Sequence, residues 1–345
     1  MPGSGAVNVL VASPLEPQHV ARIETADSRL RVLYAPDLLP VPRFPCDHTG
    51  VPRELSAAER DRWAELRERA DVSFDFDWDS PEQLPKLCPR LRWVQGTSAG
   101  IGGFLDRTGL VHSDLVFTTA AGVHGVPLAE FALLGMLHFA KRMPTLARWQ
   151  RQQHWEAHTS GIVAGTTAVV VGLGGIGREV CRLLAAAGVR VIGCGRPGRH
   201  YDVPGVSRYT DTTSLHEVLP EANALVLACP LTNQTRGLIT ARELAALPAG
   251  AVVVNVSRGA VIDEPALINA LTSGQLAGAC LDVFAVEPLP LSSPLWAMDN
   301  VIVSPHSAAT VAAENRLLVE LFIDNLQRWL AGQPLRNVYD RVTGY

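Results

Sequence analysis

The chain has 345 residues, enough for about two domains that each bury a core, and 19% of its residues are charged, with a formal net charge of −4. Because the sequence contains neither a block of like charge nor a basic stripe, we expect no nucleic-acid partner. Apolar stretches stop well short of the roughly 18 residues that cross a membrane, and the start of the chain lacks the pattern of a signal peptide, so we expect a cytoplasmic protein without a membrane partner.

The N-terminal part of the chain alternates short β-branched runs with helix-like segments. The expected strands are 7–12, 30–34, 72–74, 91–94 and 116–119. A helix over 57–70 is predicted to begin with a capping box, in which the Ser56 hydroxyl and the Glu59 carboxylate satisfy free backbone donors. The proline-rich segment 40–52 is expected to be an irregular loop. Strands and helices that alternate in this way indicate a parallel sheet covered by helices.

A long helical pattern follows from about 127 to 153, and we expect it to cross between domains or to line a subunit contact. A second alternating series has expected strands at 168–171, 189–193, 224–229, 251–256, 277–283 and 301–303, with a helix over 177–187. Capping boxes that begin at Ser214 and Thr240 predict two more helix starts, and an amphipathic helix is predicted from about 310 to 332. The order of this second series is that of a doubly wound dinucleotide domain.

A glycine-rich motif, Gly172-Leu173-Gly174-Gly175-Ile176-Gly177, joins the first strand of the second series to its helix. Such a motif is weak evidence by itself, but the strand before it and the helix after it favour a dinucleotide site. In that site Gly172 permits the turn, Gly174 lets the backbone approach the pyrophosphate, and Gly177 lets the helix pack on the sheet. The alternatives are a glycine turn that binds nothing and a methyl-donor enzyme of related fold.

The next strand ends at Cys194-Gly195-Arg196, where an NAD-specific site usually has Asp or Glu to bind the ribose 2′-hydroxyl. Gly195 stands at this position, so the site lacks that carboxylate. Arg196, aided by Arg199 or His200, is able to pair with a 2′-phosphate. We therefore predict a preference for NADP(H), with NAD(H) possible. The alternative is that Arg196 is a solvated loop residue and that either cofactor is accepted.

Three charged residues in the last quarter of the chain stand in recognisable contexts. They are Arg258 in Asn-Val-Ser-Arg-Gly, Glu287 in Val-Glu-Pro-Leu-Pro and His306 in Ser-Pro-His-Ser-Ala. A guanidinium can grip a carboxylate through two hydrogen bonds, an imidazole transfers protons near neutral pH, and a neighbouring carboxylate stabilises the imidazolium form. These are the groups that a 2-keto acid reductase needs. For His306 the alternative is a structural histidine.

These motifs resemble those of the D-isomer-specific 2-hydroxyacid dehydrogenase family. Within that family, they most resemble the motifs of the NADPH-dependent glyoxylate and hydroxypyruvate reductases. The match runs from about 91 to 337 and also includes Ser98-Ala99-Gly100, Ala129-Glu130-Phe131-Ala132, Pro230-Leu231-Thr232 with Thr235, and Leu281-Asp282-Val283-Phe284. The resemblance implies an α/β fold with two doubly wound parallel-sheet domains. A Rossmann dinucleotide domain, 119–308, would be inserted into a flavodoxin-like substrate domain, 1–118 and 309–345.

The resemblance also implies the roles of individual residues. Arg258 would hold the substrate carboxylate and keto oxygen, helped by backbone donors from Ser98, Ala99 and Gly100. His306 would donate a proton as hydride arrives from the nicotinamide, while Glu287 would bind the other imidazole nitrogen. The implied cofactor contacts are Gly172, Gly174, Gly175, Ile176, Gly177, Arg196, Cys229, Pro230, Thr235, Val256, Ser257 and, on the nicotinamide amide, Asp282. Cys229 and Val256 end buried strands, so core packing is the alternative for both.

The expected activity is the reversible reduction of a small 2-keto acid to the D-2-hydroxy acid, with Phe44, Trp296 and Leu105 or Met298 shaping the substrate pocket. The alternatives are a dinucleotide-sensing, corepressor-like interaction protein of the same fold, and oxidation of an unusual acid such as phosphite or a phosphonate. A homodimer is expected, because the helix at 127–153 resembles the subunit contact of the family. The six cysteines are scattered singly, so neither a disulfide framework nor a metal site is expected.

Overall fold

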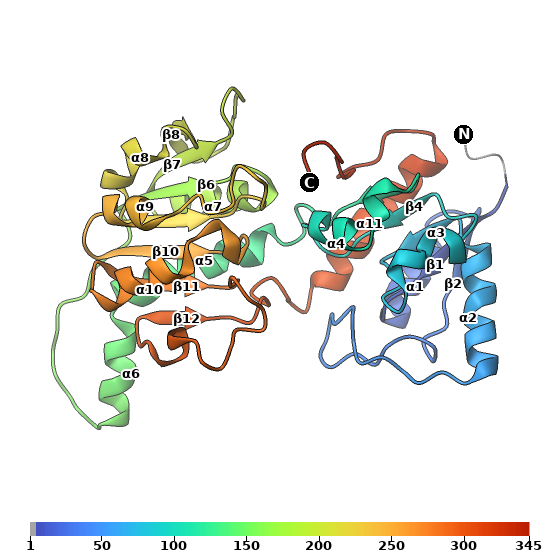
Figure 1. Ribbon diagram of the computed structural model, residues 1–345, viewed down its shortest axis with the longest axis horizontal. Helices are drawn as coiled ribbons and strands as arrows, with labels where there is room; N and C mark the ends of the chain where they lie inside the picture. The colour runs from blue at the N-terminus through green and yellow to red at the C-terminus, as the bar shows by residue number, and fades with distance from the viewer. Residues whose placement is uncertain (1–4, 345) are drawn as a thin grey trace. The chain divides into compact units, whose positions relative to one another are not determined.

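The computed structural model describes residues 5–344, and the chain divides into two compact units. One unit, called the discontinuous unit below, consists of Met1–His124 and Thr310–Tyr345. The other, the central unit, is the uninterrupted stretch Gly125–Ala309. The described segments near both ends of the chain therefore belong to the same unit (Figure 1).

The discontinuous unit is built on a five-stranded sheet in the order β2-β1-β3-β4-β5, in which every neighbouring pair is parallel. Its strands are β1 (Val7–Val11), β2 (Leu30–Leu33), β3 (Val72–Phe74), β4 (Trp93–Gln95) and β5 (Val116–Thr118). The strands are apolar and largely buried, as expected for a parallel sheet that helices cover on both faces. The order 2-1-3-4-5 is that of flavodoxin, in agreement with the fold that the family resemblance implies.

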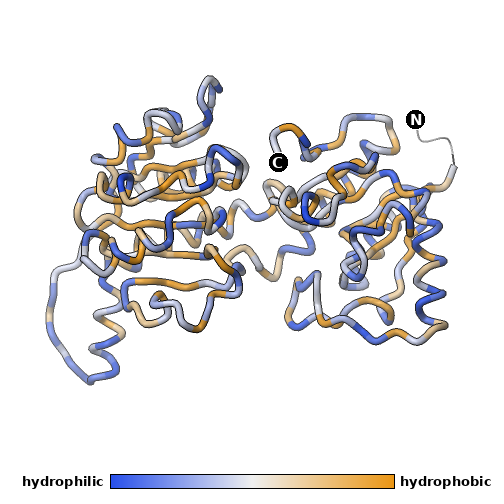
Figure 2. The backbone as a smooth tube through the Cα atoms, viewed as in Figure 1, coloured by the Kyte–Doolittle hydropathy of each residue, from blue (hydrophilic) through white to orange (hydrophobic). Residues whose placement is uncertain are grey.

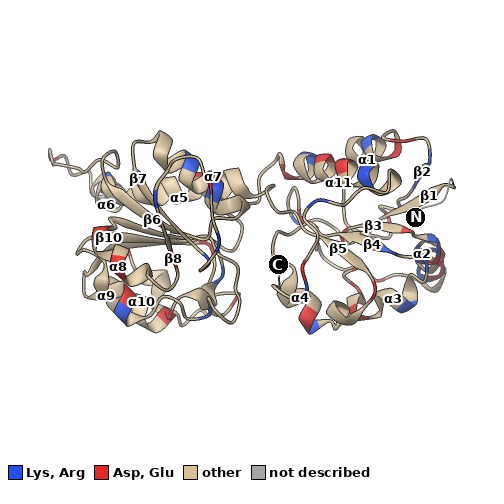
Figure 3. Cartoon of the chain, turned by 90° about the horizontal axis from the view of Figure 1, so that it is seen from above, with Lys and Arg blue, Asp and Glu red and all other residues tan. Residues whose placement is uncertain are grey.

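Helices cover the two faces of this sheet in separate groups. The helices are α1 (Pro17–Glu24), α2 (Ala57–Arg69), α3 (Leu84–Leu87), α4 (Gly102–Arg107) and α11 (Glu314–Leu330). Leu318 and Phe322 of α11 share a core cluster with Phe74 of β3, whereas Trp63 of α2 and Leu105 of α4 belong to the cluster on the other face. Figure 3 shows α1 and α11 on one side of the sheet and α3 and α4 on the other.

The central unit has a seven-stranded parallel sheet in the order β12-β11-β10-β9-β6-β7-β8. Its strands are β6 (Thr167–Val171), β7 (Arg190–Gly195), β8 (Val206–Asp211), β9 (Ala224–Leu227), β10 (Ala251–Asn255), β11 (Leu276–Leu281) and β12 (Val301–Val303). Numbered within the unit, this is the 3-2-1-4-5-6 order of a Rossmann sheet with a seventh strand added at one edge. The predicted class, two doubly wound parallel sheets, is confirmed.

The helices of the central unit are α5 (Gly125–Ala140), α6 (Met143–Arg151), α7 (Gly175–Ala186), α8 (Leu215–Val218), α9 (Ala241–Ala246) and α10 (Glu264–Thr272). α5 packs against α7, and its Leu128 and Ala132 lie in a core cluster with the strands of the sheet. Figure 2 shows hydrophobic stretches along the strands of both units and hydrophilic stretches along α2 and α6.

Two local predictions were wrong, and one strand was missed. The helix expected over 127–153 is broken in two, because Arg142 adopts φ 55° and Pro144 stands in the first turn of α6, where it supplies no backbone donor. Strand β8 was not predicted, since this edge strand exposes polar residues and lacks an apolar run. The capping box at Ser214 does not form; the Asp211 carboxylate accepts the Ser214 backbone N–H instead. Those at Ser56 and Thr240 do form.

No helix in the part of the chain that the structure describes is long and apolar enough to span a membrane. The six cysteines are unpaired and buried. Basic and acidic residues are interspersed along the chain in both units (Figure 3).

Candidate active site

The predicted triad comes from three neighbouring strands of the central unit. Arg258 follows β10, Glu287 follows β11, and His306 follows β12. Because β10, β11 and β12 are adjacent and parallel, their carboxyl ends meet at one edge of the sheet. The fold thus brings together three side chains that are 48 residues apart from first to last, Arg258 to His306.

Asn255, the last residue of β10, organises the loop that carries Arg258. Its Oδ1 accepts hydrogen bonds from the Ser257 backbone N–H at 3.0 Å and the Ser257 hydroxyl at 2.6 Å, and its Nδ2 donates to the Arg258 carbonyl at 3.2 Å. One Arg258 Nη donates to the Ser257 carbonyl at 2.7 Å. Asn255 was not among the predicted site residues, although it begins the motif that contains Arg258.

The guanidinium of Arg258 is partly buried beside two carboxylates. Burial lowers the pKa of Arg258 from its usual value, while Glu287 and Asp282 act in the opposite direction. An arginine in a protein keeps its charge under such conditions, so Arg258 presents a cation with little competing water. Gly259 is needed beside it, since an added Cβ would lie 1.9 Å from the carbonyl carbon of Phe284.

His306 and Glu287 form the closest polar contact of the triad. The imidazole Nδ1 lies 2.7 Å from Glu287 Oε2, and the backbone N–H of Phe284 donates to Glu287 Oε1 at 3.0 Å. Glu287 is therefore fixed from both oxygens. Both side chains remain partly exposed, 45% for His306 and 36% for Glu287, so the imidazole can be reached from solvent.

Asp282 shapes the turn that presents His306. Its Oδ1 accepts hydrogen bonds from the Ser304 hydroxyl at 2.6 Å and from the backbone N–H groups of Ser307 and Ala308, both at 2.9 Å. The His306 backbone N–H donates to the Asp282 carbonyl at 2.9 Å. These bonds hold His306 at φ 55°, a left-handed conformation that costs a non-glycine residue about 1–2 kcal/mol. The predicted contact of Asp282 with the nicotinamide stays a prediction.

The glycine motif forms the turn between β6 and α7 in the same sheet. Gly172 adopts φ 98°, and a Cβ there would lie 2.6 Å from the backbone of Cys229. A Cβ on Gly177 would lie 1.7 Å from the Gly172 carbonyl oxygen. Around Gly174 nothing lies within 4 Å of an added Cβ, so the space beside the start of α7 is open. Gly175 and Ile176 form the first turn of α7, where free backbone N–H groups suit a pyrophosphate.

The other predicted cofactor contacts lie at strand ends of this sheet or in the loops that follow. Arg196 comes directly after β7, and its backbone N–H donates to the Tyr201 hydroxyl at 3.0 Å. The Thr235 hydroxyl donates to the Pro230 carbonyl at 2.6 Å and so closes the loop after β9. Cys229, Val256 and Ser257 are buried, the first two within hydrophobic clusters, so their contact with a cofactor stays a prediction.

Ser98, Ala99 and Gly100 lie in the discontinuous unit, in the turn after β4. The Ser98 carbonyl accepts the Ala120 backbone N–H at 3.0 Å, which ties this turn to the segment that follows β5. Among the residues expected to shape the substrate pocket, Leu105 is fully buried in the core, so its side chain is not available to a ligand. Phe44 and Trp296 are about half exposed.

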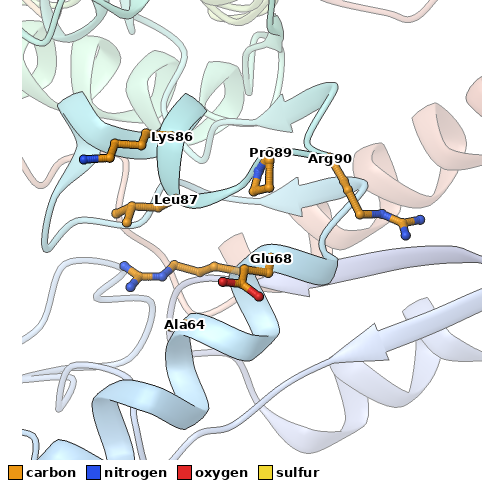
Figure 4. A pocket seen from close by; sticks show the side chains of 7 residues that line it. Ala64, Glu68, Lys86, Leu87, Pro89 and Arg90 are labelled. Atoms are coloured by element: carbon orange, nitrogen blue, oxygen red, sulfur yellow. The ribbon is translucent and has the colours of Figure 1, made fainter.

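Two surface hollows lie in the described part of the discontinuous unit. One, of about 350 Å³, is lined by Ala64, Arg67, Glu68, Lys86, Leu87, Pro89 and Arg90 (Figure 4). The other, of about 370 Å³, lies beside the proline-rich loop and includes Phe44. Neither contains a residue of the triad or of the glycine motif.

Comparisons with known proteins relate the chain to one family. Residues 133–308 match the family model described as D-isomer specific 2-hydroxyacid dehydrogenase, NAD binding domain. Glyoxylate/hydroxypyruvate reductase A of Salmonella newport is 32% identical over 275 residues, which is 78% of this chain and 86% of the relative. An uncharacterized protein of Corynebacterium melassecola is 33% identical over 278 residues, 80% of this chain and 90% of that protein.

Solved structures give the same result. A D-isomer specific 2-hydroxyacid dehydrogenase from Xanthobacter autotrophicus, in complex with NADPH and MES, matches with a TM-score of 0.78 and 31% identity, covering 99% of this chain and 100% of that one. An NADPH-dependent glyoxylate/hydroxypyruvate reductase from Sinorhizobium meliloti, with NADP and sulfate, matches with a TM-score of 0.77 and 26% identity, covering 98% and 100%. The chain thus belongs to the D-isomer-specific 2-hydroxyacid dehydrogenase family.

Proposed function

We propose that the protein reduces a small 2-keto acid to the D-2-hydroxy acid and prefers NADPH to NADH as the hydride source. The observation that carries this proposal is the His306–Glu287 pair, 2.7 Å apart, beside the partly buried cation of Arg258. An acid group and an anion-binding group at one sheet edge, in the same sheet as a glycine turn, are what such a reduction requires.

Each residue of the triad has a distinct role in the proposed reaction. Arg258 binds the substrate carboxylate through charge-assisted hydrogen bonds, and Ser98, Ala99 and Gly100 remain predicted backbone donors to the same substrate. Because Glu287 binds Nδ1 of His306, Nε2 is the ring nitrogen that gives its proton to the keto oxygen. Glu287 places a negative charge beside the protonated ring before the transfer and keeps the ring oriented. General-acid help of this kind is worth about 10²- to 10⁴-fold in rate.

The residues that would hold the cofactor are the glycine motif, Arg196 and Asp282. The bound nicotinamide supplies the hydride. The turn at Gly172 and the open space beside Gly174 fit a pyrophosphate at the start of α7. Gly195 supplies no carboxylate for the ribose 2′-hydroxyl, and Arg196 favours a 2′-phosphate, which supports the preference for NADPH. Relatives crystallised with NADPH or NADP support the same preference.

The test is oxidation of NADPH and of NADH with glyoxylate, hydroxypyruvate, pyruvate, phenylpyruvate and 2-ketoisocaproate. We expect turnover with at least one acid, faster with NADPH, and its loss by at least about 10²-fold in His306→Ala. The exposed His112→Ala serves as the control and should match the parent. Tight NADPH binding without turnover on any acid would favour a dinucleotide sensor instead.

A homodimer in the cytoplasm completes the proposal. α6 has no buried residue, and the segment after it exposes Trp155 at 99% and Ile162 at 67%, which suits a surface covered by a second copy of the chain. Six unpaired cysteines fit a reducing compartment. Light scattering coupled to gel filtration tests the dimer, and a mass of 37.1 kDa, that of one chain, would contradict it.

A further inference from the structure

The end of strand β7 is packed directly against an aromatic ring. A Cβ added to Gly195 would lie 2.2 Å from Cε2 of Tyr201 and 2.8 Å from Cδ2 and Cζ of the same ring. Gly195 does not have a positive φ, so it is space, not backbone conformation, that demands glycine here. The ring therefore occupies the volume in which a carboxylate at position 195 would begin.

Tyr201 also holds the turn that follows β7. Its hydroxyl accepts the Arg196 backbone N–H at 3.0 Å. The Arg199 backbone N–H reaches the Arg196 carbonyl at 3.4 Å, and Gly198 between them has φ 72°. Pro197 and Gly198 at the two central positions are typical of a type II turn. The Arg199 guanidinium lies 5.5 Å from the centroid of the Tyr201 ring, so the tyrosine contacts both ends of the turn.

This arrangement gathers positive charge beside the end of β7. The first and last residues of a β-turn have Cα atoms within about 7 Å, so Arg196 and Arg199 lie close together. Arg199 is exposed, and within residues 5–344 its guanidinium forms no ion pair with a carboxylate. The neighbouring Asp211 is engaged by Thr213 and Ser214. A phosphate monoester with about two negative charges suits a pair of arginines.

We propose that Tyr201 determines cofactor specificity as a positioning residue. Its ring excludes an acidic side chain from position 195, and its hydroxyl and ring face hold Arg196 and Arg199 where both bind a ribose 2′-phosphate. The inference rests on the proposed use of NADPH; it adds Tyr201 to the groups that recognise the phosphate and selects Arg199, not His200, as the partner of Arg196. Sequence alone does not indicate Tyr201, because its contact with Gly195 arises only from the path of the loop.

The first experiment separates the phosphate from the rest of the cofactor. We compare kcat/KM and the Kd from fluorescence titration for NADPH and for NADH in Arg199→Ala and Tyr201→Phe. Arg199→Ala should weaken the binding of NADPH about 10- to 100-fold, which is the usual effect of losing a hydrogen bond to a charged group. Tyr201→Phe keeps the ring and loses only the hydroxyl, so about a 2- to 10-fold effect on NADPH is expected. Values for NADH should stay within about twofold, since it lacks the 2′-phosphate.

Arg242→Ala on α9 is the control for removal of a surface arginine and should change neither cofactor. If Arg199→Ala and Tyr201→Phe lowered kcat/KM and affinity equally for NADPH and NADH, the cause would be a general structural defect and the proposal would be overturned. Unchanged NADPH values in both would overturn it as well.

The second experiment tests the space filled by the ring. Gly195→Asp should lower the Tm by about 2–10 °C, because overpacking costs about 1–3 kcal/mol. In Gly195→Asp with Tyr201→Ala the clash is removed, so the Tm should recover part of that loss and the ratio of NADH to NADPH efficiency should rise at least about 10-fold. A Gly195→Asp protein as stable as the parent would refute the placement of the ring.

The two proposals can fail separately. If the parent protein binds NADPH and NADH equally, the proposed cofactor preference fails, whatever the variants do. If the parent prefers NADPH but Tyr201→Phe and Arg199→Ala leave the preference intact, only the role of Tyr201 and Arg199 fails.

Discussion

His306 is held in place by residues that take no part in proton transfer. One carboxylate oxygen of Asp282 accepts three hydrogen bonds within the turn. These bonds keep His306 in its left-handed conformation. Asn255 does the same for the loop of Arg258. The strained backbone at His306 needs such hydrogen bonds, because a strained conformation persists only where the surrounding structure holds it.

The charge of Glu287 can be tested without disturbing its geometry. In Glu287→Gln the side-chain oxygen can still accept the Phe284 backbone N–H, but the anion beside His306 is lost. We expect kcat to fall by about 10- to 100-fold, within the range of general-acid catalysis, while the Kd for NADPH stays within about twofold. Glu264→Gln is a matched control, since Glu264 also accepts a backbone N–H, that of Ala285, and lies outside the triad. A kcat equal to that of the parent would exclude a role for this carboxylate.

The buried carboxyl group of Asp75 should make the stability of the protein depend on pH. It is fully buried just after β3, and burial raises the pKa of Asp75, while His48 acts in the opposite direction and Trp78 donates to its Oδ2 at 3.0 Å. The folded state therefore binds this proton more tightly than the unfolded state. Stability falls as pH rises from the unfolded pKa through the folded pKa, and below the unfolded pKa the carboxyl contributes no penalty.

Asp75→Asn replaces the carboxyl with a neutral group of the same shape. We expect its Tm to exceed that of the parent by a few degrees near pH 8, and the difference to shrink as the pH approaches 4, measured by differential scanning fluorimetry. Asp61→Asn on the exposed surface of α2 is the control. A Tm difference that is constant or grows toward low pH would contradict the assignment.

At the scale of the element, the turn between β6 and α7 separates glycines needed for folding from those needed for binding. Gly177→Ala places a Cβ against the Gly172 carbonyl oxygen, so we expect the Tm to fall by more than about 5 °C. Gly174→Ala meets no neighbour within 4 Å and should keep the parent Tm, but it should raise the Kd for NADPH at least about 10-fold, because the methyl group enters the space proposed for the pyrophosphate. Unchanged NADPH affinity in Gly174→Ala would argue against that placement.

Sequence predicts the elements well where the signal is local. Strands such as β6, β10 and β12 are runs of β-branched residues, and two of the three capping boxes form as expected. The exceptions depend on competition or on distant contacts. Asp211 accepts the Ser214 backbone N–H, which the Glu217 carboxylate was expected to accept, and edge strand β8 is stabilised by pairing with β7 more than by its own residues. The same holds for the site, since the triad stands in local motifs whereas the contacts of Asn255 and Tyr201 appear only in the folded chain.

At the scale of the whole molecule, the two units have separate cores and should unfold as separate transitions. Phe322 is fully buried in the core of the discontinuous unit, and loss of a buried phenylalanine costs about 3–5 kcal/mol. Phe322→Ala should therefore lower the Tm of one calorimetric transition and leave the Tm of the other unchanged. The unmoved transition should be the one that NADPH shifts upward, since ligand binding stabilises the unit that holds the ligand.

Leu225→Ala, at a fully buried position of β9, is the reciprocal variant and should lower the transition that NADPH shifts. If either variant lowered both transitions by the same amount, the units would have to unfold together.

The division of the discontinuous unit between the two ends of the chain has a consequence for synthesis. A ribosome delivers β1 to β5 first, yet α11, which covers Val9, Phe74 and Trp93, is among the last segments to emerge. The central unit is contiguous and can complete its core while one apolar face of the first sheet has α1 but still lacks α11. Chains that stop before Glu314 would lack α11 permanently, so part of that apolar face would stay exposed, and they would be substrates for chaperones and proteases.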